Sequence, residues 1–288
     1  MAPSLPRIQL YHQTLHSPAS GAPVSLLPLL AELPASLHKH IVVAIAAIHL
    51  NDLPAPHLTI NDHAASDVRY VELRASLPRL RAAGITLTAM VGGAAAGTFT
   101  RLDGADWEAY YALLRDFLRA WQLQGADLDV EEPMSLAGAV RLVRRLRADF
   151  GPAFVITFAP VAAAMQGVAN LSGFDYAALE ATVGAEIAWY NTQFYCGWGS
   201  VADGGAGFMA ILERGWDPEK VVVGVVTNPD NANGYVELDK LIGALGMLKE
   251  FGVGGVMGWE YFNSLPGGVE APWEWALHMG GAFGLFDE

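Results

Sequence analysis

The chain has a single cysteine, Cys196, and is short of positive charge. One cysteine excludes an internal disulfide, which fits a reducing compartment. Lysine and arginine together number 17 against 30 aspartates and glutamates, and the net charge is −13. Nucleic acid and anionic membrane both require basic surface, so we expect neither as a partner. The charge fits a neutral or cationic ligand, or simply solubility.

Long apolar segments and targeting signals are missing as well. No apolar run reaches the length needed to span a bilayer. Residues 1–6 lack the basic region followed by an apolar region that marks a signal peptide, and strand-like sequence begins at Ile8. We therefore expect a cytoplasmic protein, or a secreted one if a leader has been removed. The hydrophobic fraction is nevertheless 52% of 288 residues, which is enough for a large core.

Apolar, β-branched runs recur along the chain, and each is followed by a stretch with helical spacing. Successive runs start roughly 30 residues apart, the length of one strand–helix unit. Eight such units without a linker predict a single α/β domain over 1–288, folded as a (β/α)₈ barrel; the alternative is an open doubly wound sheet. The predicted strands are Ile8–Gln13, His40–Ile48, Ile85–Val91, Gly125–Glu131, Phe154–Ala159, Glu186–Tyr195, Val221–Thr227 and Val253–Trp259.

Three acids stand at alternate positions in the fourth of these strands. Side chains alternate between the faces of a strand, so Asp127, Asp129 and Glu131 share one face. Because neighbouring carboxylates repel, a protein tolerates this only where some stay protonated or a ligand is bound. Functional groups of such barrels lie where the strands end, and Glu131 is last. Glu131 is therefore a candidate general acid, with a divalent-metal site or a helix-capping cluster as the alternative.

The segment Gly125–Glu131 resembles the signature of family 18 glycoside hydrolases, the chitinases and endo-β-N-acetylglucosaminidases. The family pattern is Asp-Gly-x-Asp-x-Asp-x-Glu, and only its first position differs here, where Gln124 replaces Asp. Gly92-Gly93 resembles the family's Ser-x-Gly-Gly element, with Met90 in place of Ser. The resemblance covers essentially the whole chain.

Two further elements support the same resemblance. The triplet Gln193-Phe194-Tyr195 resembles the Gln-x-Tyr of short, single-domain members, and Trp259 resembles the tryptophan that floors the sugar site. Strand alternation puts Gln193 and Tyr195 on one face and turns Cys196 away from the sugar. We also predict that Tyr11 and Asn228 contact substrate, because both lie on or near predicted strands of the barrel.

The resemblance implies a retaining hydrolase in which the substrate's own 2-acetamido oxygen attacks the anomeric carbon. It implies that Glu131 protonates the glycosidic oxygen and later deprotonates water. Asp129 would hold the acetamido N–H and stabilise the oxazolinium cation, and Asp127 would share a proton with Asp129. Tyr195 would donate to the acetamido carbonyl, and Gln193 would contact the same sugar. No cofactor or metal is implied.

The length of the chain bears on the substrate. Thr227 is followed closely by the helix predicted near Glu237, which leaves no room for the insertion domain of larger chitinases. Few aromatic platforms are available beyond Trp259 and Trp198. The segment 259–263 also resembles small fungal and bacterial endo-β-N-acetylglucosaminidases. We therefore favour cleavage in the di-N-acetylchitobiose core of N-glycans, with a short-chain chitinase or an inactive sugar-binding protein as alternatives.

Overall fold

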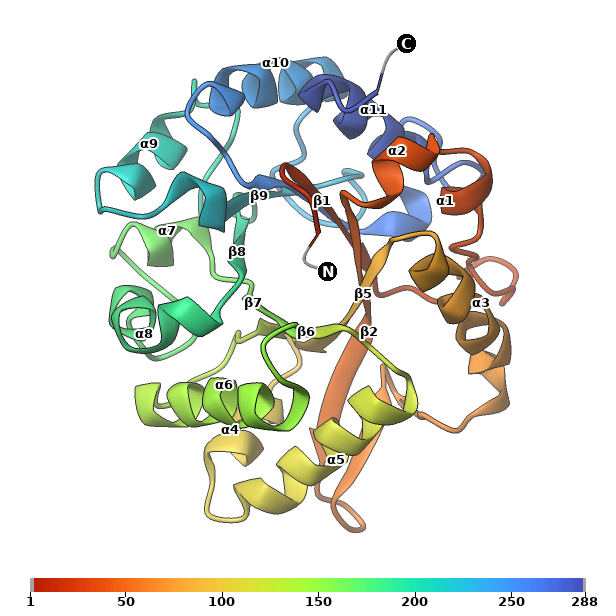
Figure 1. The fold of residues 1–288 in the computed structure, drawn as a ribbon, viewed down its shortest axis with the longest axis vertical. Coiled ribbons are helices and arrows are strands. Elements are labelled where there is room, and N and C mark those ends of the chain that lie inside the picture. Colours follow the sequence, from red (N-terminus) through yellow and green to blue (C-terminus); the bar gives the residue numbers. More distant parts are fainter. Residues whose placement is uncertain (1–2, 287–288) are drawn as a thin grey trace.

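A computed structural model describes residues 3–286, which form a closed barrel of parallel strands wrapped by helices (Figure 1). β1 pairs with both β2 and β10, so the sheet closes on itself. The predicted (β/α)₈ barrel is confirmed, and the open sheet is wrong. Around the barrel the strands are β1 (Arg7–His12), β2 (Ile41–Asn51), β5 (Thr86–Gly92), β6 (Gly125–Asp129), β7 (Val155–Phe158), β8 (Trp189–Gln193), β9 (Val221–Val226) and β10 (Gly255–Trp259).

The helices lie on the outside of the barrel (Figure 1). Short helices precede or accompany the longer ones in several units. The α-helices, long and short, are α1 (Pro28–Ala31), α2 (Ala35–His38), α3 (Val71–Ala82), α4 (Thr98–Asp103), α5 (Trp107–Ala120), α6 (Leu136–Phe150), α7 (Ala162–Met165), α8 (Tyr176–Val183), α9 (Ala206–Leu212), α10 (Leu238–Lys249) and α11 (Glu274–Phe283).

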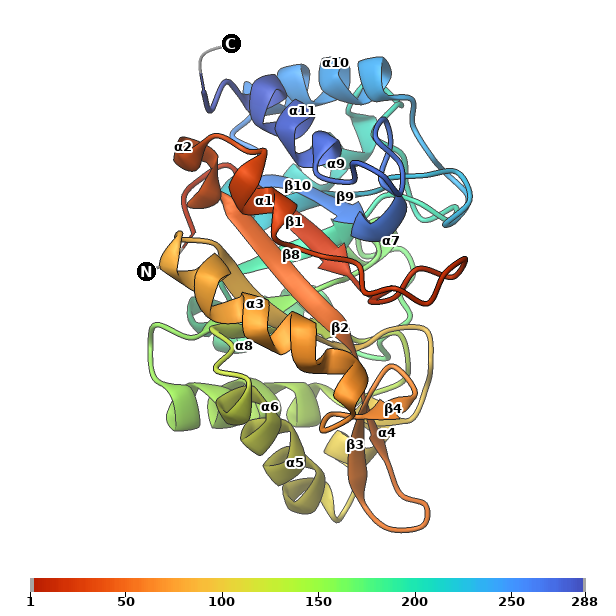
Figure 2. The ribbon, with the colours of Figure 1, turned by 90° about the vertical axis from the view of Figure 1, so that its right-hand side faces the viewer.

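The second strand is longer than predicted, and it continues into two short strands that the sequence did not predict. β2 continues to Asn51 and pairs antiparallel with β3 (His57–Ile60), which pairs with β4 (His63–Ala64). Figure 2 shows this hairpin extending beyond the barrel below α3. The two added strands are short, so they give little period-two signal.

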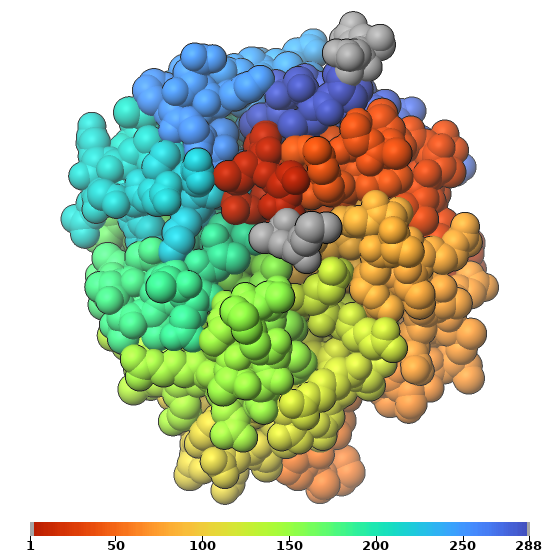
Figure 3. All heavy atoms as spheres, in the orientation of Figure 1, coloured from red at the N-terminus to blue at the C-terminus, as the bar shows by residue number. Residues whose placement is uncertain are grey.

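The strands run from the end of the barrel seen in Figure 1 toward its far side, as the arrowheads in Figure 2 show. Figure 3 shows the near end in space-filling form, with segments of many colours meeting around its centre. The C-terminal strand ends, where barrel proteins carry their functional groups, are on the opposite side.

Buried side chains divide by the direction in which they point from the strands. Leu128 and Val130 on one face of the β6 segment join the large apolar core under the helices. On the other face Asp127 and Asp129 point into the barrel. Asn191, from β8, also reaches Asp127. The alternation predicted for the acid segment is thus confirmed, with apolar residues outside and carboxylates inside.

Two strand boundaries differ from the prediction and affect the site. β6 ends at Asp129 and β8 ends at Gln193, so Glu131 and Tyr195 lie on the connections that follow. The pairing partners explain the first difference, because β5 pairs with β6 as far as Asp129 and β7 only as far as Leu128, so neither neighbour reaches Glu131. Residues 227–237 join β9 to α10 directly, without an insertion domain. Among residues 3–286, no helix has the length and apolar character needed to cross a membrane.

Candidate active site

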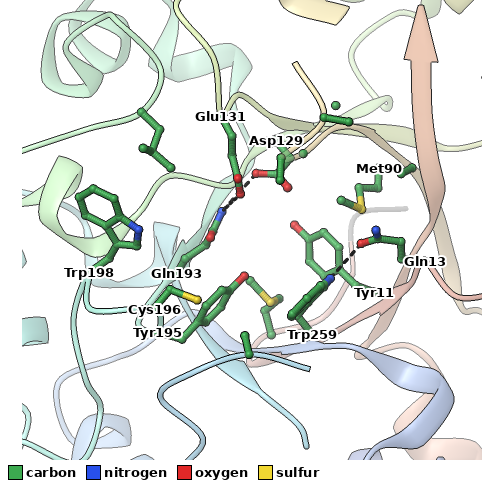
Figure 4. Close-up of a pocket in the computed structure, with 18 of the residues that line it drawn as sticks. Tyr11, Gln13, Met90, Asp129, Glu131, Gln193, Tyr195, Cys196, Trp198 and Trp259 are labelled. Atoms are coloured by element: carbon green, nitrogen blue, oxygen red, sulfur yellow. Dashed lines mark hydrogen bonds between the residues drawn. The ribbon is translucent and has the colours of Figure 1, made fainter. Parts of the chain in front are cut away.

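A cavity of about 410 Å³ opens where the barrel strands end (Figure 4). This volume is in the range of pockets that bind small organic ligands. Of the eight residues predicted for the site, Asp127 lies below the cavity and Asn228 outside it. The other six line the cavity: Tyr11, Asp129, Glu131, Gln193, Tyr195 and Trp259.

Asp127 is fully buried and accepts hydrogen bonds from three side chains. The Tyr11 hydroxyl donates to Oδ2, while Oδ1 accepts from the Thr157 hydroxyl at 2.5 Å and from the Asn191 amide at 2.8 Å. Burial raises the pKa of Asp127, and the three hydrogen bonds oppose that shift. Burial, then the charge of Asp127, raises the pKa of Tyr11 well above its usual value, so the phenol keeps its proton and donates.

Asp129 and Glu131 lie together in the cavity wall. Burial, then the charges of Glu131 and Asp127, raises the pKa of Asp129 well above its usual value, and a hydrogen bond to Glu131 adds to the shift. The Gln193 amide donates to Asp129 Oδ1 and to Glu131 Oε1, each at 3.2 Å (Figure 4). Gln193 thus holds the two carboxyls side by side. The oxygens of Asp127, with which the resemblance implies that Asp129 shares a proton, accept from Tyr11, Thr157 and Asn191.

The backbone at Asp129 depends on the glycine pair of the preceding strand. Gly92 is in register with Asp129, and its φ is +87°. A Cβ atom on Gly92 would lie 2.3 Å from the Phe99 ring and 2.7 Å from the Asp129 carbonyl oxygen. The Gly93 N–H donates to that same carbonyl at 2.9 Å. Only glycine at position 92 allows β5 to approach the acid-bearing strand this closely.

Aromatic rings form another wall of the cavity. Tyr195 and Trp259 are nearly parallel, with centroids 6.3 Å apart and ring planes 13° apart. The Trp259 indole N–H donates to Gln13 Oε1 at 2.9 Å, and the Glu260 carboxylate accepts from the Thr14 N–H and hydroxyl at 2.6 and 2.8 Å. Burial raises the pKa of Tyr195 well above its usual value, so its hydroxyl remains a donor, and it points into the cavity (Figure 4).

Comparison with solved structures finds family 18 enzymes that are similar to this chain over nearly its whole length. A fungal endo-β-N-acetylglucosaminidase from glycosyl hydrolase family 18 is 43% identical; 97% of this chain and 98% of that chain are covered, with a TM-score of 0.90. A chitinase from Aspergillus fumigatus is 46% identical over 96% of this chain and 99% of that chain, with a TM-score of 0.86. The chain belongs to glycoside hydrolase family 18. It is a glycoside hydrolase, as the sequence predicts.

More distant family 18 structures share the fold. A chitinase from Pseudoalteromonas aurantia is 19% identical over 96% of this chain and 99% of that chain, with a TM-score of 0.76. A scan against models of protein families finds no match, and neither does a search of curated proteins.

The two departures from the family 18 motifs have local explanations. The Gln124 side chain accepts a hydrogen bond from the Leu87 N–H at 3.0 Å, so it ties β6 to β5 at the start of the strand. Met90 lies in the cavity wall next to the glycine pair, with its terminal methyl 3.0 Å from the Cβ position of Gly93. Hydroxyl groups still reach Asp127, from Tyr11 and Thr157.

Asn228 is not in the cavity. Its amide donates to the Asn263 carbonyl at 2.8 Å, and its Oδ1 accepts from the Asp230 N–H at 3.0 Å. These bonds hold together the loops that follow β9 and β10. The prediction that Asn228 contacts substrate conflicts with this geometry, because the hydrogen bonds of the side chain shape its own loop.

Cys196 is exposed and lines the cavity, so the prediction that it turns away is wrong. The prediction assumed that the strand continued past Tyr195, but β8 ends at Gln193. Cys196 has a φ of +55°, and a residue in that conformation breaks the alternation of a strand.

Several other cavity residues gave no sequence signal of their own. Gln13, His49 and Leu171 line the cavity from connections or strand ends. Trp198, one of the two aromatic platforms expected from the sequence, lines the cavity as well. Among residues 3–286, no group of three or more His, Cys, Asp or Glu residues is arranged to hold a metal ion.

Proposed function

We propose that this family 18 enzyme cleaves β-1,4 linkages between N-acetylglucosamine residues with the help of the substrate's acetamido group. The observation that carries the proposal is that one Gln193 amide nitrogen donates to both Asp129 Oδ1 and Glu131 Oε1, each at 3.2 Å. Two carboxyls that share one donor lie closer together than the roughly 6.5–9.5 Å that inverting glycosidases need to admit a water between them. Burial and the charge of Glu131 raise the pKa of Asp129, and a protonated carboxyl is a poor nucleophile, which favours a nucleophile that belongs to the substrate.

In this proposal Glu131 is the acid that protonates the glycosidic oxygen and then the base that deprotonates the incoming water. It is the less buried of the pair and lies on the connection after β6. Asp129, when its proton has moved away, is a carboxylate that accepts the acetamido N–H and stabilises the positive oxazolinium ring. The buried Asp127 discourages a second negative charge next to it, so it regulates when Asp129 ionises.

Tyr195, Gln193 and Trp259 complete the proposed sugar site. The Tyr195 hydroxyl would donate to the acetamido carbonyl and orient its oxygen toward the anomeric carbon. Gln193 holds both carboxyls and would contact the same sugar. The Trp259 indole, fixed by Gln13, offers an apolar face on which the pyranose ring stacks. Tyr11 acts from below, through Asp127.

We further propose that the preferred substrate is the di-N-acetylchitobiose core of N-glycans. The direct connection over residues 227–237 leaves the cavity without the wall that an insertion after β9 would build. Trp198 and Trp259 are the tryptophans in the cavity lining, which is a short aromatic track for a polymer. The 43% identical relative is an endo-β-N-acetylglucosaminidase. The 46% identical chitinase favours the second candidate, cleavage of short chitin oligomers.

Incubation with two substrates side by side decides between these candidates. We expect a high-mannose glycoprotein to lose its glycans and keep one N-acetylglucosamine on each asparagine, as measured by mass spectrometry of the intact protein. A chitin oligomer under the same conditions is the comparison, and the Glu131→Gln variant is the control for contaminating activity. An unchanged glycoprotein alongside rapid cleavage of the oligomer would reverse the choice of substrate.

A further inference from the structure

Glu132 directly follows the proposed acid, and its side chain points into the protein. It is 4% exposed, and both carboxylate oxygens are occupied. Oε1 accepts from the Phe99 N–H at 2.7 Å. Oε2 accepts from the Gly97 N–H at 2.8 Å and from the Thr100 hydroxyl at 2.7 Å. A buried carboxylate with three donors and no contact with the cavity has a task other than binding sugar.

The donors to Glu132 belong to one side of the cavity. Gly97–Thr100 is the start of α4, and the segment just before it contributes Gly93, Ala94 and Ala95 to the cavity lining. That segment is fastened at both ends, to β6 and to the connection that follows β6. Gly93 N–H donates to the Asp129 carbonyl at the near end, and Glu132 takes the bonds from 97–100 at the far end.

The bonds to Glu132 also restrain the backbone that carries Glu131. The Ser172 hydroxyl donates to the Val130 carbonyl at 2.7 Å, which fixes the residue before Glu131. Glu132 fixes the residue after it. Among residues 3–286, the side-chain donor to Glu131 is the Gln193 amide, at 3.2 Å. Its position therefore depends on the residues at either side in the chain.

We propose that Glu132 is a positioning residue that holds Glu131 and the 93–97 segment in the geometry needed for proton transfer to the leaving group. The inference rests on the proposed function of Glu131. It follows from charge and geometry, because three donors converge on one buried carboxylate that is covalently next to the acid. Displacing a catalytic group by about 1 Å can cost as much as 10²-fold in rate.

The test compares two leaving groups. kcat/KM reports the steps up to departure of the leaving group, and a 4-nitrophenyl leaving group departs with little help from an acid. We expect Glu132→Gln to lower kcat/KM about tenfold or more on the natural oligosaccharide and less than about threefold on 4-nitrophenyl di-N-acetylchitobioside. Each oxygen of Glu132 accepts a backbone N–H, so the NH₂ group of glutamine would face the N–H of either Phe99 or Gly97, and at least one bond is lost.

Asp103→Asn is the matched control. Asp103 also joins α4 to the connection after β6, through bonds from the Ser135 N–H and hydroxyl at 2.8 and 2.7 Å, but it does not line the cavity. We expect this variant to lower the melting temperature and to leave the ratio of the two kcat/KM values unchanged. A purely structural role of Glu132 would give the same result as this control.

The outcomes are distinct. Equal losses on the two substrates, or no loss, in a folded Glu132→Gln protein would overturn the positioning role. If that variant does not fold, Thr100→Val removes a single donor from an exposed residue and should reduce kcat/KM about twofold to fourfold on the oligosaccharide alone; no selective loss would then overturn the proposal. A wild-type protein that cleaves neither substrate would instead contradict the proposed function.

Discussion

Replacing Glu131 with glutamine should reduce kcat on an oligosaccharide by a factor of about 10² to 10⁴, the usual contribution of a general acid. The amide has the shape of the carboxyl but cannot deliver a proton to the glycosidic oxygen. Its carbonyl oxygen can still accept the hydrogen bond from Gln193. Sugar binding should therefore remain, and calorimetric titration with a chitin oligomer measures it separately from turnover.

The control for this substitution is Glu108→Gln, which makes the same chemical change on the exposed surface of α5. It should leave kcat and the dissociation constant unchanged. A Glu131→Gln protein with activity close to the wild type would mean that another group supplies the proton. Loss of both turnover and binding would assign Glu131 to sugar binding rather than to acid catalysis.

The second large effect is expected at Asp129, where substitution should lower the activity and raise the stability relative to wild type. Asp129→Asn should lower kcat by a factor of about 10² to 10³, the typical result of removing one preorganised electrostatic group from a developing charge. The amide oxygen can still accept the bond from Gln193, but the side chain cannot become the anion that stabilises a cationic ring. Kinetics with the same oligosaccharide measures this loss.

The stability of this variant should move in the opposite direction. The pKa of Asp129 is higher in the folded protein than in the unfolded chain, where it is about 3.9. The folded state therefore binds this proton more tightly, and its stabilising contribution is lost as the pH rises through the folded pKa. Asparagine has no proton to lose. The melting temperature of Asp129→Asn minus that of wild type should increase with pH above about 4.

The exposed Asp106→Asn on the same barrel serves as the control for this pH series, because its side chain makes no capping bond. Its melting temperature should follow the wild type at every pH. A melting temperature for Asp129→Asn that falls below that of wild type at neutral pH would contradict the assignment of a raised pKa to Asp129. A buried carboxyl in an active site is a position at which a protein loses stability in return for activity.

The parts of the site that could be predicted from sequence are those with a regular backbone. Asp127 and Asp129 lie on one strand, so alternation alone put them on the same side. The barrel topology then placed them near the strand ends. Gln193 followed in the same way from β8. For these residues a period of two and a fold class were sufficient.

The residues that sequence reasoning misplaced lie just past the strands. Cys196 has a positive φ, and no periodicity extends through such a position. Asn228 stands where a strand ends, but its loop uses the side chain for its own hydrogen bonds. Only the paths of the connecting segments reveal these roles, and those paths depend on contacts between residues distant in the chain.

Two buried glutamates, Glu132 and Glu260, could not be recognised as structural residues from the sequence alone. Glu132 and Glu260 each follow a site residue directly, and each accepts backbone N–H bonds from the loop of a neighbouring strand. A polar residue at such a position is usually taken to face solvent. Burial with several donors is visible only when the neighbouring loops are in place.

The most direct test of substrate-assisted cleavage is inhibition by a thiazoline derived from di-N-acetylchitobiose, a stable mimic of the oxazolinium intermediate. We expect competitive inhibition of 4-nitrophenyl di-N-acetylchitobioside hydrolysis. The inhibition constant should lie at least about 10²-fold below KM, because mimics of the intermediate bind far more tightly than substrate. The affinity would come from Asp129 and Tyr195. Absence of inhibition at thiazoline concentrations equal to KM, in an enzyme that cleaves the substrate, would contradict the account.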